Sequence, residues 1–78
     1  MSNLKAIRTS INASQDELAE HVGVTQGAIA HFEKGIRTPN INMCWRIVEA
    51  LNRMGANCSF EDVFPTPGNQ DTSKKPRN

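Results

Sequence analysis

SQDELAEHVGVTQGAIAHFEKG, residues 14–35, holds the signals for two helices joined by a very short turn. Ser14 with Glu17 three positions later forms the capping-box pattern, in which two side chains satisfy free amides at a helix start. Gly23 is the residue type that best tolerates the left-handed backbone common at a helix end, and Thr25 can cap the next helix. A link this short forces the two helices to cross steeply.

Apolar residues recur at helical spacing in this stretch, so each helix has one face that can be buried. Those faces hold Leu18, Ala19 and Val22 in the first of the two helices and Ala28, Ile29 and Phe32 in the second, which we expect to end near Gly35. The outward face of the second is unusual, because solvated faces normally carry long Glu and Lys side chains. It presents Gln26, Gly27, Ala30, His31 and Lys34.

The flanking sequence also shows helical spacing, with no convincing alternation of the kind that marks a strand. We expect a first helix over about residues 3–12, a fourth that Asn40 caps after the break at Pro39, and a last turn opened by Ser59 with Asp62. The apolar residues that mark the first helix are Leu4, Ile7 and Ile11. Those of the fourth helix are Ile41, Cys44, Ile47 or Val48, and Leu51. Those of the last turn are Phe60, Val63 and Phe64. The predicted fold class is therefore all-α, a compact five-helix domain with a helix-turn-helix.

Size and composition fit one small domain. The chain has 78 residues, of which 37% are apolar and 22% charged, near the lower limit for a stable single core. No apolar run approaches the roughly 20 residues that span a membrane, and no secretory leader opens the chain, so we expect a cytoplasmic protein. Cys44 and Cys58 lack metal-ligand spacing, and we expect two free thiols, with Cys44 a small buried hydrophobe.

The net charge of +1 is unevenly distributed along the chain. Residues 1–64 hold six Lys/Arg against seven Asp/Glu, whereas residues 65–78, PTPGNQDTSKKPRN, hold three basic residues against one acidic. This last segment has three prolines and no large apolar side chain, so it cannot bury enough surface to offset the entropy of ordering. We expect a folded domain over 1–64 followed by a flexible basic tail over 65–78.

The joined pattern of the two central helices is Gln15-x-x-Leu18-Ala19-x-x-Val22-Gly23-Val24-x-x-x-x-Ile29-x-x-Phe32, which fills every apolar and glycine position of a helix-turn-helix. In this pattern the chain resembles the Cro and repressor proteins of temperate phages, and the small bacterial regulators that share their lambda-repressor-like domain. The resemblance runs over about residues 3–64, continuing through RIVEAL and FEDVF. It implies sequence-specific binding of double-stranded operator DNA by a homodimer, with the third helix in the major groove.

The outward face of the third helix suits that role, because a helix in the groove needs small residues for close approach and others that read base edges. Gln26 can bond one adenine, Ala30 can touch a thymine methyl, and His31 can bond guanine N7 or a phosphate. Gly27 lets the helix sit closer, or is simply tolerated in the first turn; many relatives carry a longer polar side chain there. The predicted base-reading residues are Gln26, Gly27, Ala30 and His31.

Phosphate contacts are expected at the edges of the motif. Gln15, at the start of the second helix, matches a phosphate-contacting residue of the family. Arg37 either contacts phosphate or is a solvated loop arginine, and the capping role of Asn40 already explains that residue. The predicted phosphate-binding set is Arg8, Gln15, Thr25, Lys34, Arg37, Thr38 and Asn40. The basic residues within 74–77 of the tail either track the DNA backbone or play no part.

The resemblance also implies an ion pair between Arg8 and Glu33, joining the first and third helices. Arg8 shares the side of the first helix that carries Leu4 and Ile11. We expect the pair to support the recognition helix and, secondarily, to turn Arg8 toward a phosphate.

Relatives dimerise through the end of the fourth helix and the segment after it, which places the expected interface over residues 54–64. Its predicted members are Met54, Cys58, Phe60, Val63 and Phe64. The interface is expected to be weak and to be completed on DNA. Trp45 has two interpretations: it completes the monomer core, or it joins an exposed apolar patch shared across a two-fold axis.

The predicted function is a Cro-like repressor that occupies a palindromic operator without a cofactor, a metal or a small-molecule ligand. A controller of a restriction-modification operon or an antitoxin-type regulator would share the fold, and a helix-turn-helix used only as a protein-interaction module is a further alternative. We expect no enzyme, because His21 and His31 have no nucleophile or metal partner in the sequence.

Overall fold

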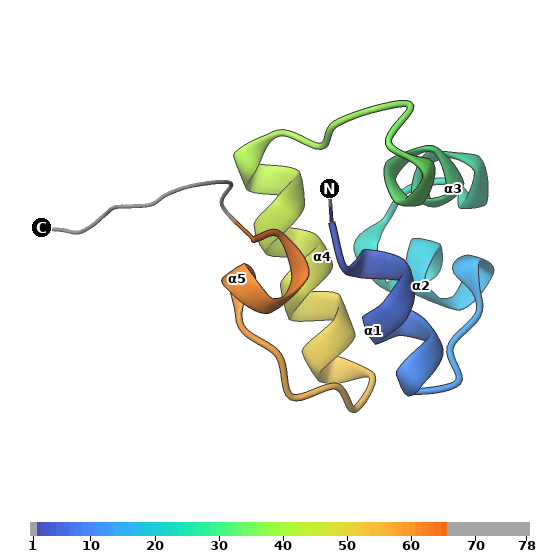
Figure 1. The fold of residues 1–78 in the computed structure, drawn as a ribbon. Helices are drawn as coiled ribbons and strands as arrows, with labels where there is room; N and C mark the ends of the chain where they lie inside the picture. Colours follow the sequence, from blue (N-terminus) through green and yellow to red (C-terminus); the bar gives the residue numbers. More distant parts are fainter. Residues whose placement is uncertain (1, 66–78) are drawn as a thin grey trace, which may run out of the picture.

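Five helices account for most of residues 2–65, the part of the chain that the computed structural model describes. They are α1 (Leu4–Ser10), α2 (Gln15–Val22), α3 (Gln26–Lys34), α4 (Ile41–Arg53) and α5 (Phe60–Val63) (Figure 1). Within the described range there is no strand, so the all-α prediction is confirmed. The basic tail expected over 65–78 lies outside the described residues, apart from Pro65.

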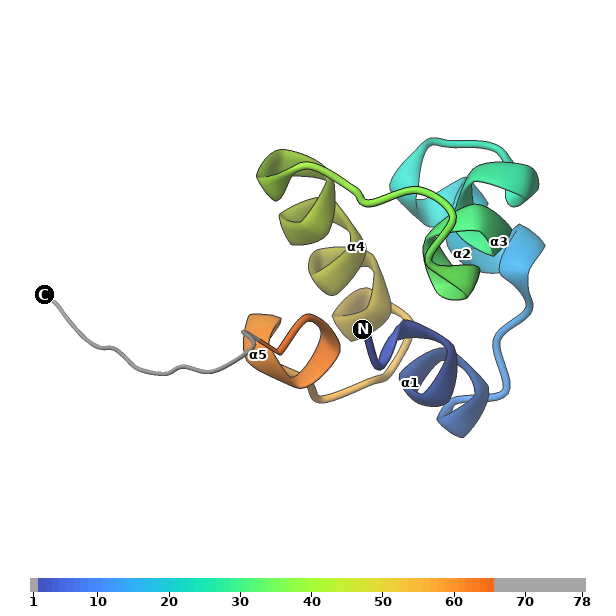
Figure 2. The same ribbon diagram turned by 45° about the horizontal axis from the view of Figure 1, so that its top comes forward.

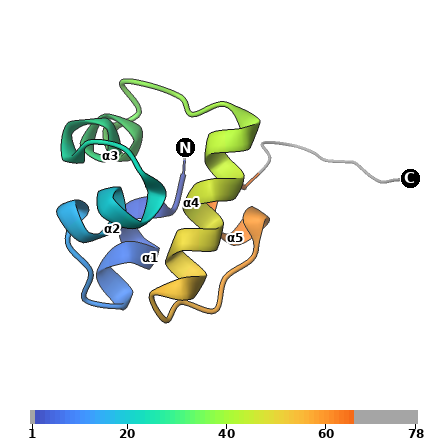
Figure 3. The same cartoon turned by 180° about the vertical axis from the view of Figure 1, so that it is seen from behind.

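The longest helix, α4, separates α5 from the helix-turn-helix pair. In the three views α5 lies on one side of α4, and α2 and α3 lie on the other (Figures 1, 2 and 3). The N-terminal segment is tied to α5, because the backbone amide of Asn3 donates to the carbonyl of Val63 at 2.8 Å. This arrangement leaves α3 at an edge of the domain.

The helix starts predicted from the sequence are confirmed by the capping side chains. Ser14 and Ser59 each form a complete capping box, with Glu17 and Asp62 respectively. The Thr25 hydroxyl accepts from the Ala28 amide at 3.1 Å, and Asn40 Oδ1 accepts from the amide of the third helical residue at 2.8 Å. Each such cap contributes typically about 1 kcal/mol and fixes where the chain enters the helix.

Buried apolar side chains from all five helices form one core. Its fully buried members are Leu4, Leu18, Ile29, Ile47, Leu51 and Val63. Burying each contributes about 1.5–3 kcal/mol relative to leaving it exposed, so the core is the main source of stability. Cys44 is also buried, as expected, and both cysteines are free thiols.

Two expectations about the hydrophobic residues need correction. Val63 cannot belong to a dimer interface as predicted, because α5 docks on the N-terminal segment and leaves its side chain fully buried in the core. Trp45 does not complete the monomer core: its side chain lies on the outer surface of α4, and the residue is 55% exposed. Of the two interpretations of Trp45, the one that places it in an exposed apolar patch therefore remains.

The end of α2 is held by an arginine from α4. Gly23 adopts a left-handed backbone with φ of +91°, and the Arg46 guanidinium donates to the Val22 carbonyl at 2.7 Å. A cation at the C-terminus of a helix also interacts favourably with the helix dipole. The left-handed backbone favours glycine here, and a Cβ atom on Gly23 would lie 2.9 Å from Nη2 of Arg46, whose side chain would have to shift.

Arg8 and Glu33 form a buried ion pair that joins α1 to α3. Arg8 Nε donates to Glu33 Oε2 at 2.5 Å and Nη2 donates to Oε1 at 3.2 Å, while Nη1 donates to the Ala13 carbonyl at 2.7 Å. The two side chains are only 10% and 3% exposed. The guanidinium faces inward and has three of its nitrogens engaged, so the phosphate contact expected of Arg8 is wrong for this arrangement.

Replacing Glu33 alone should destabilise the fold more than removing both charges. Glu33→Ala leaves the Arg8 guanidinium buried without its counter-charge, which costs about 3–5 kcal/mol. A double variant with leucine at both positions strands no charge and is expected to lose less. Urea unfolding followed by circular dichroism measures the free energy of unfolding of the single and the double variant. If both variants lose the same stability, an unpaired buried charge does not explain the loss.

Replacement by alanine should change the free energy of unfolding in opposite directions at Gly23 and Gly27 of the helix-turn-helix. Gly23→Ala places an L side chain in the left-handed region and against Arg46, and is expected to cost about 1–2 kcal/mol or more. Gly27→Ala is the matched control, because the nearest atom to its Cβ is Thr25 Oγ1 at 4.0 Å. It should raise the free energy of unfolding by up to about 1 kcal/mol. Loss of stability at both positions would show that Gly27 is also required by packing.

Candidate nucleic-acid interface

The outward face of α3 presents the residues that the sequence predicted there. Gln26, Gly27, His31 and Lys34 are exposed, and Ala30 is half-buried. Beneath them Ile29 and Phe32 enter the core. The helix therefore lies on the domain with its polar face open.

No carboxylate is exposed on this face of α3. Glu33 is the single acidic residue between Gln26 and Lys34, and its carboxylate is buried against Arg8. The ion pair thus removes the negative charge that would oppose binding of an anionic partner.

The buried pair continues outward through two glutamines. Gln15 Nε2 donates to Glu33 Oε1 at 2.9 Å, and Gln26 Nε2 donates to Gln15 Oε1. A polar chain of Arg8, Glu33, Gln15 and Gln26 therefore crosses α1, α2 and α3, running from the interior to the exposed start of α3. Each link restricts the rotamer of the next side chain, and Gln26 is joined to this chain at the surface.

The glutamine link was not predicted from the sequence, which treated Gln15 and Gln26 as separate contacts. A signal for it exists, because each glutamine is the first residue of its helix in the motif. The steep crossing that a short turn imposes can bring two helix starts together. Pairing of the two side chains nevertheless depends on the exact crossing geometry, which spacing does not give.

Hydrogen-bonding capacity remains on both glutamines after these internal bonds are counted. A glutamine amide has two N–H donors and an oxygen that accepts. Gln26 uses one N–H, which leaves its Oε1 and its second N–H free. Gln15 retains one N–H, because its oxygen accepts from Gln26 and its other N–H donates to Glu33.

The remaining predicted contacts flank α3 at its two ends. The Thr25 hydroxyl caps the start of the helix and keeps its O–H donor. Lys34 lies in the last turn, and the Arg37 guanidinium carbon sits 5.9 Å from the centre of the Phe32 ring. Asn40 uses Oδ1 for its cap and retains its amide donors. Thr38 is exposed in the loop between α3 and α4.

His21 and the two cysteines lie apart from this face. The ring Nδ1 of His21 is 2.9 Å from the Glu17 carbonyl on the exposed side of α2. Burial raises the pKa of the Cys44 and Cys58 thiols, with the charge of Asp62 adding to the effect at Cys58, so both stay protonated at neutral pH. In residues 2–65 no three His, Cys, Asp or Glu side chains gather in a way that could hold a metal ion.

A membrane-spanning helix is likewise absent from the described part of the chain, where no helix is both long and apolar enough to cross a bilayer.

Comparison with known proteins matches α1 through α4 to one family. The helix-turn-helix family model aligns with residues 4–53. An uncharacterized HTH-type transcriptional regulator of Methanothermobacter thermautotrophicus is 40% identical over 57 residues, which cover 73% of this chain and 77% of that protein. A second, from Archaeoglobus fulgidus, is 32% identical over 63 residues, covering 81% and 82% of the two chains. The regulator YgzD of Bacillus subtilis, also uncharacterized, is 33% identical over 63 residues, covering 81% and 88%.

The family match extends over more than half of the chain and includes the whole of α2, the turn and α3. The similar proteins are of comparable length, since this chain covers more than three quarters of each. The chain belongs to the helix-turn-helix family.

Proposed function

We propose that the chain is a sequence-specific DNA-binding transcriptional regulator, a Cro-like repressor that binds a palindromic operator as a dimer with α3 in the major groove. The observation that carries this proposal is the hydrogen bond from Gln26, at the exposed start of α3, to a polar chain that begins in the core. The similar proteins are named as transcriptional regulators, which supports the same class of function.

Gln26 retains the donor and acceptor pair that adenine recognition requires. In the major groove adenine presents an N6 amino group as donor and N7 as acceptor, and a glutamine amide matches both. Oε1 of Gln26 is free to accept from N6, and its second N–H is free to donate to N7. Internal bonding therefore orients this side chain without consuming the groups that read the base.

The rest of the face allows the helix backbone to approach the bases. Gly27 adds no side chain and Ala30 adds a single methyl, which can contact the methyl group of thymine. His31, one turn further along, can bond guanine N7 or a phosphate. We propose these three residues, with Gln26, as the base-reading set of the interface.

Phosphate contacts are proposed for residues at the edges of the motif. Gln15 opens α2, so its free N–H and the amides of the first turn can approach the same phosphate. Lys34 places positive charge in the last turn of α3, and Arg37 adds another in the loop that follows. The proposed phosphate-binding set is Gln15, Thr25, Lys34, Arg37, Thr38 and Asn40.

Repression by this mechanism requires only that the dimer occupies its operator, because a bound dimer excludes RNA polymerase from an overlapping promoter. A two-fold dimer places its two α3 helices in half-sites about one helical turn apart. The operator is therefore proposed to be palindromic, with one adenine in each half-site read by Gln26.

Selection from randomised duplex DNA at near-physiological salt tests the proposal directly. The intact chain should enrich a two-fold symmetric site, and Gln26→Ala should relax the preference at one base pair in each half-site, at a cost of about 1–3 kcal/mol per contact. His21→Ala is the control, because His21 is exposed on α2 outside the proposed interface. Absence of any enriched sequence would contradict DNA reading and favour the protein-interaction module.

Replacing Lys34 should weaken binding to all sequences alike. A lysine that neutralises one phosphate contributes about 0.9 to the slope of log affinity against log salt. Lys34→Ala should make that slope shallower by about this amount per subunit without changing the preferred sequence. Lys5→Ala removes the same charge from the exposed side of α1 and should leave the slope unchanged. The same decrease in both variants would mean that total charge, rather than position, sets the affinity.

A further inference from the structure

A hollow of about 400 Å³ lies where the loop between α3 and α4, residues 35–40, meets the first turn of α4 and the end of α5. We name it the loop hollow. Clefts that hold small ligands in proteins have volumes of about 300–1,000 Å³, so its size suits a small molecule. Apolar side chains form much of its wall, and two polar side chains of the loop join them. These residues are Phe32, Pro39, Cys44 and Phe64, with Arg37 and Thr38.

Hydrogen bonds at both ends of the loop hold it in place. At the α3 end, the backbone amides of Ile36 and Arg37 donate to the carbonyl of His31 at 3.0 and 3.3 Å. At the α4 end, the Cys44 thiol donates to the carbonyl of Pro39 at 3.6 Å. The loop therefore keeps its position without a ligand, and little ordering would be needed for one to bind.

The charge at the loop hollow is positive. Among residues 2–65, Arg37 is the one charged residue that lines it, and no carboxylate of that range forms an ion pair with the Arg37 guanidinium. Thr38 adds a hydroxyl that can donate. Glu33 lines a smaller hollow that shares Phe32 with this one, but its carboxylate is bonded to Arg8. An apolar wall with a cation beside it suits an anion that has an apolar body.

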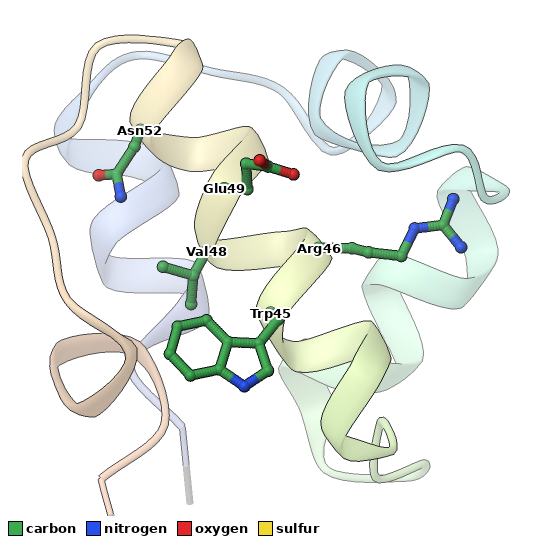
Figure 4. Close-up of a pocket in the computed structure, with 5 residues that line it drawn as sticks. All are labelled: Trp45, Arg46, Val48, Glu49 and Asn52. Carbon is green, nitrogen blue, oxygen red and sulfur yellow. The ribbon is translucent and has the colours of Figure 1, made fainter.

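A second hollow, of about 380 Å³, lies on α4 and differs in charge (Figure 4). We name it the α4 hollow. Trp45 and Val48 supply its apolar part, and Glu49 places an exposed carboxylate beside them. In the close-up Arg46 extends to the other side of α4, where it bonds the Val22 carbonyl. Because Glu49 would repel an anion, the α4 hollow serves as an internal comparison for the loop hollow.

We propose that the loop hollow binds a small monocarboxylate with an aromatic body, and that this ligand weakens the binding of DNA. Arg37 pairs with the carboxylate, because a guanidinium can form two parallel hydrogen bonds with it. The aromatic body packs against Phe32 and Phe64, since rings attract one another in offset or tilted pairs. The ligand thus uses the charge and the apolar wall together.

The effect on DNA follows from the double use of Arg37, and this part of the inference rests on the proposed function. Arg37 belongs to the proposed phosphate-binding set, and a guanidinium paired with a carboxylate no longer attracts a phosphate. By linkage, DNA must weaken the ligand by the same factor as the ligand weakens DNA. The sequence led us to expect no small-molecule ligand, because Phe32, Cys44 and Phe64 are far apart in the chain and only the fold brings them together.

Phenylacetate is the probe for this site. Phenylacetamide has nearly the same shape without the charge, and acetate has the charge without the ring. Calorimetry with the full chain should show that phenylacetate binds about tenfold more tightly than either, since a bond between charged groups is worth roughly 1.5–3 kcal/mol. No binding of phenylacetate, or equal affinities for the acid and the amide, overturns the proposal.

The two cysteines report where the probe binds, because Cys44 lines the loop hollow and Cys58 does not. The rate of alkylation by N-ethylmaleimide is measured at each cysteine by mass spectrometry. Phenylacetate should slow the reaction of Cys44 and leave that of Cys58 unchanged. Equal protection of both cysteines, or protection of neither, overturns the proposed location.

Substitutions separate the two hollows. Arg37→Gln should weaken the binding of phenylacetate about tenfold and leave that of phenylacetamide unchanged, and it should fold because Arg37 is an exposed loop residue. Arg53→Gln is the matched control, since it removes an exposed arginine at the other end of α4. Glu49→Gln tests the α4 hollow. An equal effect of Arg53→Gln, or tighter binding in Glu49→Gln, overturns the proposal.

The link to DNA is measured with the duplex selected by the intact chain. Saturating phenylacetate should lower the affinity for this duplex by about fivefold, and the Arg37→Gln chain should show no such change. Acetate at the same concentration controls for ionic strength. Binding of phenylacetate without any loss of DNA affinity overturns the competition for Arg37. A chain that selects no DNA would contradict the proposed function, whereas the binding of phenylacetate to the DNA-free chain decides the ligand site separately.

Discussion

Arg8 and Glu33 hold α1 against α3 through a buried ion pair, and the geometry of the exposed helix depends on it. From Glu33 the hydrogen bonds pass to Gln15 at the start of α2 and then to Gln26 at the start of α3. Three helices are thereby held to one another by polar groups with directional requirements. The apolar core beneath them sets how close the helices lie, whereas the polar chain connects the buried ion pair to one surface side chain, Gln26.

The balance of energies explains why such a pair is placed here. Two buried charges lose much of their hydration, and their attraction often does no more than offset that loss. The core of Leu, Ile and Val side chains provides stability without such a cost. What the pair adds is geometric and electrostatic: α3 is oriented, and its single carboxylate is turned away from a face proposed to meet DNA. A leucine pair could hold the helices together but could not orient Gln15.

Local signals in the sequence predicted the helices well, because each cap and each apolar spacing acts within one or two turns. Ser14, Thr25, Asn40 and Ser59 begin their helices as expected. The resemblance supplied the Arg8–Glu33 pair, but neither it nor spacing revealed that this pair is continuous with both glutamines. The sequence did not decide whether Trp45 is buried, and it wrongly assigned Val63 to a dimer interface. Both follow from the docking of α5, which is a single turn and whose position depends on contacts with residues almost 60 positions away.

We propose that the polar chain orients Gln26 before DNA binds and that Gln26 then contacts a base. Proton–nitrogen NMR of the side-chain amides, recorded for the free chain and with the selected duplex, measures both parts. We predict dispersed, slowly exchanging amide signals for Gln15 and Gln26 in the free protein, and shifts of both on binding. The Asn52 amide, bonded to Cys58 on the far side of the domain, should serve as an unshifted reference. Averaged glutamine signals in the free chain, or shifts confined to another surface, would contradict the claim.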